Sequence, residues 1–163
     1  MDLDETNRAV LYLLQRDARR LTTQEMAEKI GVSASTVRNR IEQMEEEGVI
    51  RGYHPIVDYD EAGLQLHMVF TCSAPSHERE RLALEARNVA SVIAIAEVID
   101  GKDNIQIEAV GVNTDDIARI NDDLEDLGLE VVDSKILKSY HTQPFDHFGQ
   151  HIVNEEDDGD GDV

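Results

Sequence analysis

Residues 22–43 read TTQEMAEKIGVSASTVRNRIEQ, and the spacing of a few residues within this stretch decides the fold. Thr22 and Glu25 have the spacing of a capping box, in which a hydroxyl and a carboxylate bond to the free N–H groups at a helix start. Gly31 suits the left-handed conformation that follows many helix ends, and Ser33 can cap a further helix. The stretch therefore predicts two short helices joined by a tight turn.

Three positions indicate how these two helices pack against each other. Ala27 is small where the first helix must approach the second, Gly31 lies four residues further on, and Val37 follows after six more. Val37, Ile41 and Met44 recur at helical spacing and give the second helix a buried face. This combination is typical of a helix-turn-helix unit.

The flanking sequence extends this unit on both sides. Residues 3–18 place Leu and Val side chains on one face at helical spacing, which predicts a preceding helix. After Gly48, residues 49–57 (VIRGYHPIV) are expected to form a short hairpin or wing, in which Pro55 excludes a central strand. The predicted order of helix, helix, turn, helix and wing is that of a winged helix-turn-helix.

The outward face of the second helix of the motif carries side chains that can read DNA. In the major groove arginine pairs with guanine, and asparagine or glutamine pairs with adenine. The candidate DNA-binding residues are Ser35, Thr36, Arg38, Asn39, Arg40, Gln43 and Arg51. We expect base contacts from Ser35, Arg38 and Asn39, and phosphate contacts from Thr36, Arg40 and Arg51. The alternative is a helical domain whose polar face is solvated or contacts another protein.

The distribution of charge supports this assignment. Acids outnumber bases 35 to 15 in the 163 residues, for a net charge of −20, which is unusual for a nucleic-acid binder. However, residues 1–56 hold ten acids and eight bases, whereas residues 57–163 hold 25 acids and seven bases. Only four of the bases are Lys and eleven are Arg, a composition that resembles proteins of extreme halophiles. We therefore interpret the acidity as adaptation to salt. The N-terminal third lacks the large excess of acids, which allows it to approach phosphate.

The rest of the chain alternates strand and helix patterns. Strands are predicted at 67–73, 89–99, 104–110 and 129–140, and helices at 76–88 and 114–127. The order βαββαβ is that of a ferredoxin-like unit, so the predicted fold class is α+β. Because two helices cover only one face of a four-stranded sheet, we expect a second copy to cover the other face in a homodimer.

A winged helix-turn-helix followed by a βαββαβ unit resembles the Lrp/AsnC family, the leucine-responsive or feast/famine regulators. The resemblance covers roughly residues 2–140, and its specific motifs lie in LDETNRAVL (3–11), MAEKIGVS (26–33), VRNRI (37–41) and GVIRGY (48–53). It implies a transcription factor that binds pseudo-palindromic double-stranded DNA, dimerises through its C-terminal sheet and assembles further, up to octamers. It also implies an amino acid or related metabolite as effector.

The family's effector site lies at the turn between the second and third strands, with the pattern Gly, two residues, Asp. Here Gly101 matches, the Asp position is Asn104, and an acid stands one residue earlier at Asp103. A carboxylate can pair with a ligand ammonium, whereas an asparagine amide can only form a hydrogen bond with it. The candidate effector residues are Gly101, Asp103 and Asn104, and the alternative is a plain hairpin turn without a ligand.

Other reactive side chains do not form a recognisable site. The single Cys72 excludes an intramolecular disulfide and any multi-cysteine metal site within one chain. His141, His147 and His151 lie close together in sequence, but they provide fewer fixed ligands than a zinc site requires. We therefore expect no metal, no cofactor and no enzymatic activity.

These patterns predict three parts: a DNA-binding domain (1–60), a ligand-binding and oligomerisation domain (61–140), and a histidine-containing extension with an acidic disordered tail (141–163). No apolar run approaches the ~18 residues of a membrane span, so a cytoplasmic protein without a membrane partner is expected. The predicted function is sequence-specific transcriptional regulation modulated by a small molecule. The alternative is a ligand-sensing or metal-linked module whose helix-turn-helix contacts proteins.

Overall fold

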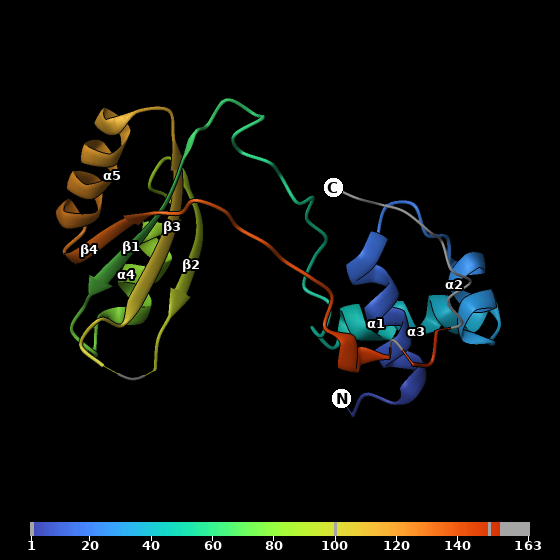
Figure 1. The fold of residues 1–163 in the computed structure, drawn as a ribbon. Helices are drawn as coiled ribbons and strands as arrows, with labels where there is room; N and C mark the ends of the chain where they lie inside the picture. The colour runs from blue at the N-terminus through green and yellow to red at the C-terminus, as the bar shows by residue number, and fades with distance from the viewer. Residues whose placement is uncertain (1, 100, 150, 154–163) are drawn as a thin grey trace. The chain divides into compact units, whose positions relative to one another are not determined.

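The computed structural model describes residues 2–99, 101–149 and 151–153 of the chain. The chain forms two compact units, each with its own core (Figure 1). The sheet unit comprises Ile56–Tyr140, and the N-terminal unit comprises Met1–Pro55 together with the returning segment from His141. The segment from His141, which the sequence predicts as a histidine-containing extension, packs with the first unit.

The N-terminal unit contains the helices expected from the sequence, with the expected caps. Thr22 Oγ1 accepts from the Glu25 N–H at 3.2 Å, and a Glu25 carboxylate oxygen accepts from the Thr22 N–H at 2.7 Å. Gly31 adopts φ +81°, and Ser33 Oγ accepts from the Thr36 N–H at 3.1 Å. The elements are α1 (Glu5–Asp17), α2 (Thr23–Ile30), α3 (Ala34–Glu46) and a single 3-10 turn, η1 (Asp146–Phe148).

Residues from the C-terminal segment complete the core of this unit. Val153 is buried among apolar side chains of α1, α2 and α3. Gly149 lies so close to α1 that a Cβ there would be 3.1 Å from Cα of Ala9. The backbone N–H of Phe145 donates to Oε1 of Gln15 at 2.7 Å. The N-terminal unit is therefore built from both ends of the chain.

The predicted wing is the main departure from the sequence-based expectation. Residues 49–57, all of them described, contain no strand. The N–H groups of Val49 and Ile50 instead donate to the carbonyl oxygen of Met44 at 2.8 and 3.0 Å. Because these two donors close the end of α3 and Pro55 has no N–H to give, three of the nine residues cannot donate to a hairpin ladder.

The sheet unit has the predicted βαββαβ order, which confirms the α+β, ferredoxin-like fold. All neighbouring strands are antiparallel, in the order β2-β3-β1-β4 (Figure 1). No helix in the described part of the chain is long and apolar enough to cross a membrane. The elements are β1 (Leu66–Ser73), α4 (Arg79–Ala86), β2 (Val92–Glu97), β3 (Ile105–Gly111), α5 (Thr114–Asp126) and β4 (Glu130–Ile136).

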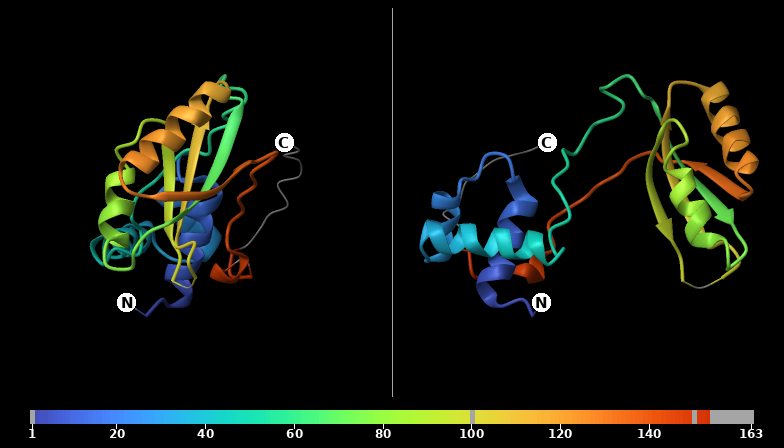
Figure 2. Two further views of the ribbon diagram at one scale, coloured as in Figure 1. Left: turned by 90° about the vertical axis from the view of Figure 1, so that its left-hand side faces the viewer. Right: turned by 180° about the vertical axis from the view of Figure 1, so that it is seen from behind.

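The two faces of this sheet differ because strand side chains alternate. Met68, Phe70 and Cys72 point toward α4 and α5, which lie on one side of the sheet (Figure 2). On the other face the register pairs Val69 with Glu108 and Thr71 with Gln106. Within the described part of this unit, helices cover only the first face.

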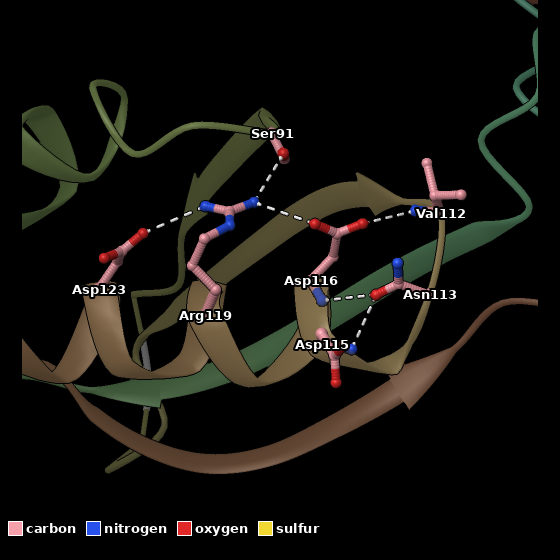
Figure 3. Close-up of polar contacts among 7 residues, drawn as sticks. All are labelled: Ser91, Val112, Asn113, Asp115, Asp116, Arg119 and Asp123. Carbon is pink, nitrogen blue, oxygen red and sulfur yellow. Dashed lines mark hydrogen bonds and ion pairs between the residues drawn. The ribbon is translucent and has the colours of Figure 1, made fainter.

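A polar cluster around Arg119 fixes the start of α5 against the sheet (Figure 3). The Arg119 guanidinium donates to Ser91 Oγ at 3.1 Å and to an Asp123 carboxylate oxygen at 3.2 Å. Asp116 lies 3.7 Å from the same guanidinium and accepts from the Val112 N–H at 2.8 Å. That N–H is the main cause of the lowered pKa of Asp116. The cluster therefore has a structural role within the unit.

Candidate nucleic-acid interface and effector turn

Helix α3 has one buried face and one exposed face. Val37 and Met44 are fully buried in the core of the N-terminal unit. Ser35, Arg38 and Asn39 lie on the exposed side, and within the described residues no ion pair or hydrogen bond engages the side chains of Arg38 and Asn39. The three side chains expected to contact bases therefore share one accessible surface.

The hydroxyl groups at the start of α3 form a small network. Ser33 Oγ lies 2.9 Å from Ser35 Oγ and 2.8 Å from Thr36 Oγ1. These groups surround the helix N-terminus, where free N–H groups and the helix dipole favour an anion. This position suits the phosphate contact expected for Thr36, which is partly buried.

Two other candidate DNA-binding residues have partners inside the unit. Nη2 of Arg40 lies 2.8 Å from Oδ2 of Asp4, whose Oδ1 accepts from the backbone N–H of Asn7. Arg40 thereby joins α3 to the first turn of α1. Nε2 of Gln43 donates to Oε1 of Glu47 at 3.0 Å. A contact of either side chain with DNA would compete with the interaction that it already makes.

A side-chain hydrogen bond also holds the segment after α3 to the helix. The Tyr53 hydroxyl donates to Oε1 of Glu45 at 2.8 Å. Partial burial and the neighbouring carboxylate raise the pKa of Tyr53 to about 12. The bond fixes the chain just beyond Arg51, which is exposed and remains a candidate phosphate contact.

The effector turn contains one buried and two exposed candidates. Gly101 has φ +103°, and it and Asp103 are exposed. Asn104 is only 5% exposed, and both ends of its amide are bonded to Ala74. Its Oδ1 accepts from the Ala74 N–H at 3.0 Å, and its Nδ2 donates to the Ala74 carbonyl at 2.8 Å. Asn104 therefore anchors the turn, which sequence reasoning did not anticipate.

The C-terminal histidines lie outside any α-helix or strand, and His147 lies in the 3-10 turn η1. Nδ1 of His147 lies 2.6 Å from a carboxylate oxygen of Asp146, and its ring stacks on Phe145 at 5.3 Å. Because η1 is a single 3-10 turn, His147 and His151 do not share an α-helical face. Within the described residues no three His, Cys, Asp or Glu side chains are grouped so that they could hold a metal ion. The acidic tail expected at 154–163 lies outside those residues.

Comparison with known proteins decides the family. The family model for winged helix-turn-helix DNA-binding proteins matches residues 3–51. An uncharacterized HTH-type transcriptional regulator of Pyrococcus furiosus is 31% identical over 103 residues, which are 61% of this chain and 69% of the relative. The chain belongs to the family of winged helix-turn-helix (HTH-type) transcriptional regulators. As a member of this family it is a DNA-binding transcriptional regulator.

Solved structures of Lrp/AsnC-like proteins share the fold. The leucine response regulatory protein LrpA of Mycobacterium tuberculosis superposes with a TM-score of 0.76 at 18% identity, covering 90% of this chain and 99% of that one. A Neisseria meningitidis transcriptional regulator in complex with L-Met gives a TM-score of 0.72 at 24% identity, covering 88% and 96%. At these identities the likeness concerns the fold alone.

Proposed function

We propose that this regulator recognises specific DNA sequences through base contacts from Ser35, Arg38 and Asn39. The observation that carries the proposal is the exposure of these three side chains on α3, opposite its buried face. Thr36 and Arg51 contact phosphates on either side. Because the protein acts on DNA, we place it in the cytoplasm.

Arg40 and Gln43 contribute less to DNA binding than the other candidates. Arg40 already holds an ion pair with Asp4, and Gln43 already donates to Glu47, so a contact of either side chain with DNA competes with these interactions. Breaking an existing contact offsets what the new contact gains. We therefore assign Arg40 chiefly to positioning α3 against α1.

The active form is a homodimer, with higher oligomers assembled from it. The uncovered face of the sheet supports this proposal, because exposed Ala94 and Ala96 lie beside Glu108 and Gln106 on that face. A second sheet packed there would bury these small side chains. Two copies of α3 could then reach successive turns of the major groove.

The effector is an amino acid or related metabolite that binds at the 101–104 turn. A structurally similar regulator is described as a complex with L-Met, which supports an amino acid as the ligand class. Asn104 holds the turn in place through Ala74, while Gly101 and Asp103 face the ligand. The exposed Asp103 carboxylate would pair with the ligand ammonium.

The acid excess adapts the protein to concentrated salt. A net charge of −20 with only four Lys supports this proposal. In such a solvent counterion release contributes little affinity, so base contacts must contribute more. We expect the logarithm of affinity to fall only gently with the logarithm of salt concentration. A steep slope would contradict this.

Selection of genomic DNA fragments tests the proposed function. The purified protein is compared with the Arg38→Ala, Asn39→Ala double variant in molar KCl, with folding and oligomeric state checked for both. We expect the wild type to recover a few discrete sites and the variant to lose them. Equal recovery by both proteins would refute the assignment and favour a helix-turn-helix that contacts proteins.

A further inference from the structure

One acidic residue lies among the side chains proposed to read DNA. Glu42 is exposed on α3, seven residues after Ser35 and three after Asn39. Positions i, i+4 and i+7 share a helix face, so Ser35, Asn39 and Glu42 form one stripe. Seven residues of helix rise about 10 Å, which equals about three base-pair steps of DNA.

Glu42 differs from two acids nearer the end of the helix. Glu45 accepts a hydrogen bond from Tyr53, and Glu47 accepts one from Gln43. In the described part of the chain, Glu42 takes part in no such bond, and it forms no ion pair with Arg38, four residues before it. Its carboxylate is therefore available on the DNA-facing stripe.

DNA phosphates repel a carboxylate at this place. Binding is not weakened only if the carboxylate gains a hydrogen bond from a base. In the major groove guanine offers two acceptors, thymine offers one, and adenine places an acceptor beside its amino group. Cytosine offers an amino donor, which a carboxylate can accept from. A carboxylate on the stripe therefore favours cytosine and disfavours the other bases.

We propose that Glu42 is a specificity-determining residue that recognises a cytosine amino group next to the bases read by Arg38 and Asn39. The inference rests on the proposed function, because it requires α3 to lie in the major groove. In this role the Glu42 carboxylate acts chiefly by disfavouring wrong sequences and adds little to the affinity for the right one.

Selection from randomised duplex DNA tests this role with the full-length protein. Glu42→Gln is compared with the wild type, with Arg38→Ala, and with Glu46→Gln. The last is a matched control that removes the same charge one turn nearer the helix end. We expect the wild type to prefer cytosine at one position by roughly tenfold. Glu42→Gln loses the preference for cytosine in favour of adenine, the base that glutamine pairs with, without weakening overall binding, while Glu46→Gln retains it.

Three results would overturn the inference. Equal tightening of binding to all sequences by Glu42→Gln and by Glu46→Gln would make Glu42 a simple repeller of phosphate. The altered preference could fall at the position changed by Arg38→Ala, which would make Glu42 a support for Arg38. If the wild type itself enriches no sequence, the proposed function fails first, and this inference fails with it.

Discussion

Replacing Asn104 with aspartate is expected to destabilise the sheet unit in a pH-dependent way. The wild-type amide both accepts from and donates to Ala74, and its side chain is almost fully buried. Asn104→Asp keeps an acceptor for the Ala74 N–H. It also places a carboxylate oxygen against the Ala74 carbonyl, where the amide group now donates at 2.8 Å.

The size of the effect follows from these contacts. Leaving the buried carbonyl of Ala74 unpaired costs about 1–3 kcal/mol, and desolvation of the new carboxylate adds to this. A loss of about 3 kcal/mol at neutral pH corresponds to a fall in Tm of roughly 10–25 °C for a unit of this size. Family membership alone would instead suggest that Asn104→Asp restores a ligand-binding acid.

The sign of the pH dependence is fixed by the protonated form. A neutral carboxyl can donate to the Ala74 carbonyl as the amide does, so folding raises the pKa of the introduced group above its unfolded value. The penalty is therefore small below the unfolded pKa and grows as pH rises through the folded pKa.

Urea unfolding followed by circular dichroism measures this effect. The wild type, Asn104→Asp and the exposed control Asp103→Asn are compared at about pH 4 and about pH 8 in the same KCl concentration. We expect the difference between Asn104→Asp and the wild type to be large only at the higher pH. A variant as stable as the wild type at both pH values would refute the structural role of Asn104.

Three further outcomes are expected. Gly149→Ala places a Cβ 3.1 Å from the Ala9 backbone at φ +128°, so the thermal transition of the N-terminal unit should fall by the equivalent of about 1–3 kcal/mol; an unchanged transition would contradict the close approach. Ultraviolet titration should find the pKa of Tyr53 at about 12 and lower in Glu45→Gln; because folding raises this pKa, the stabilisation is present below the unfolded value and lost as pH rises through 12. Burial raises the pKa of Cys72 to about 11, so iodoacetamide at about pH 8 should modify the thiol only after unfolding; rapid reaction of the native protein would refute its burial.

Features that depend on neighbours in the sequence could be predicted from the sequence. The capping box of Thr22 and Glu25 and the left-handed Gly31 follow from local spacing, and the structure confirms both features. The alternating burial of β1 follows from the period of the strand predicted at 67–73, and Met68 and Phe70 are buried on one face.

Features that depend on distant partners could not be predicted in this way. Arg40 has the composition and position of a phosphate contact, yet its partner is Asp4, 36 residues earlier on α1. Asn104 occupies an effector position, yet it bonds to Ala74, 30 residues away. In both cases residue type gave the bonding capacity, and only tertiary packing determined which partner used it.

The contact between Phe145 and Gln15 joins positions 130 residues apart. This separation sets the order in which the two units can fold during synthesis. During synthesis α1, α2 and α3 leave the ribosome long before Val153, a part of their own core, has been made. All strand partners of the sheet unit lie within Ile56–Tyr140, so that unit can fold while the end of the chain is still missing. The contacts that close the long loop between Gln15 and Phe145 form last, and they form slowly. A chain that stops before His141 would therefore carry a finished sheet and an unfinished DNA-binding unit.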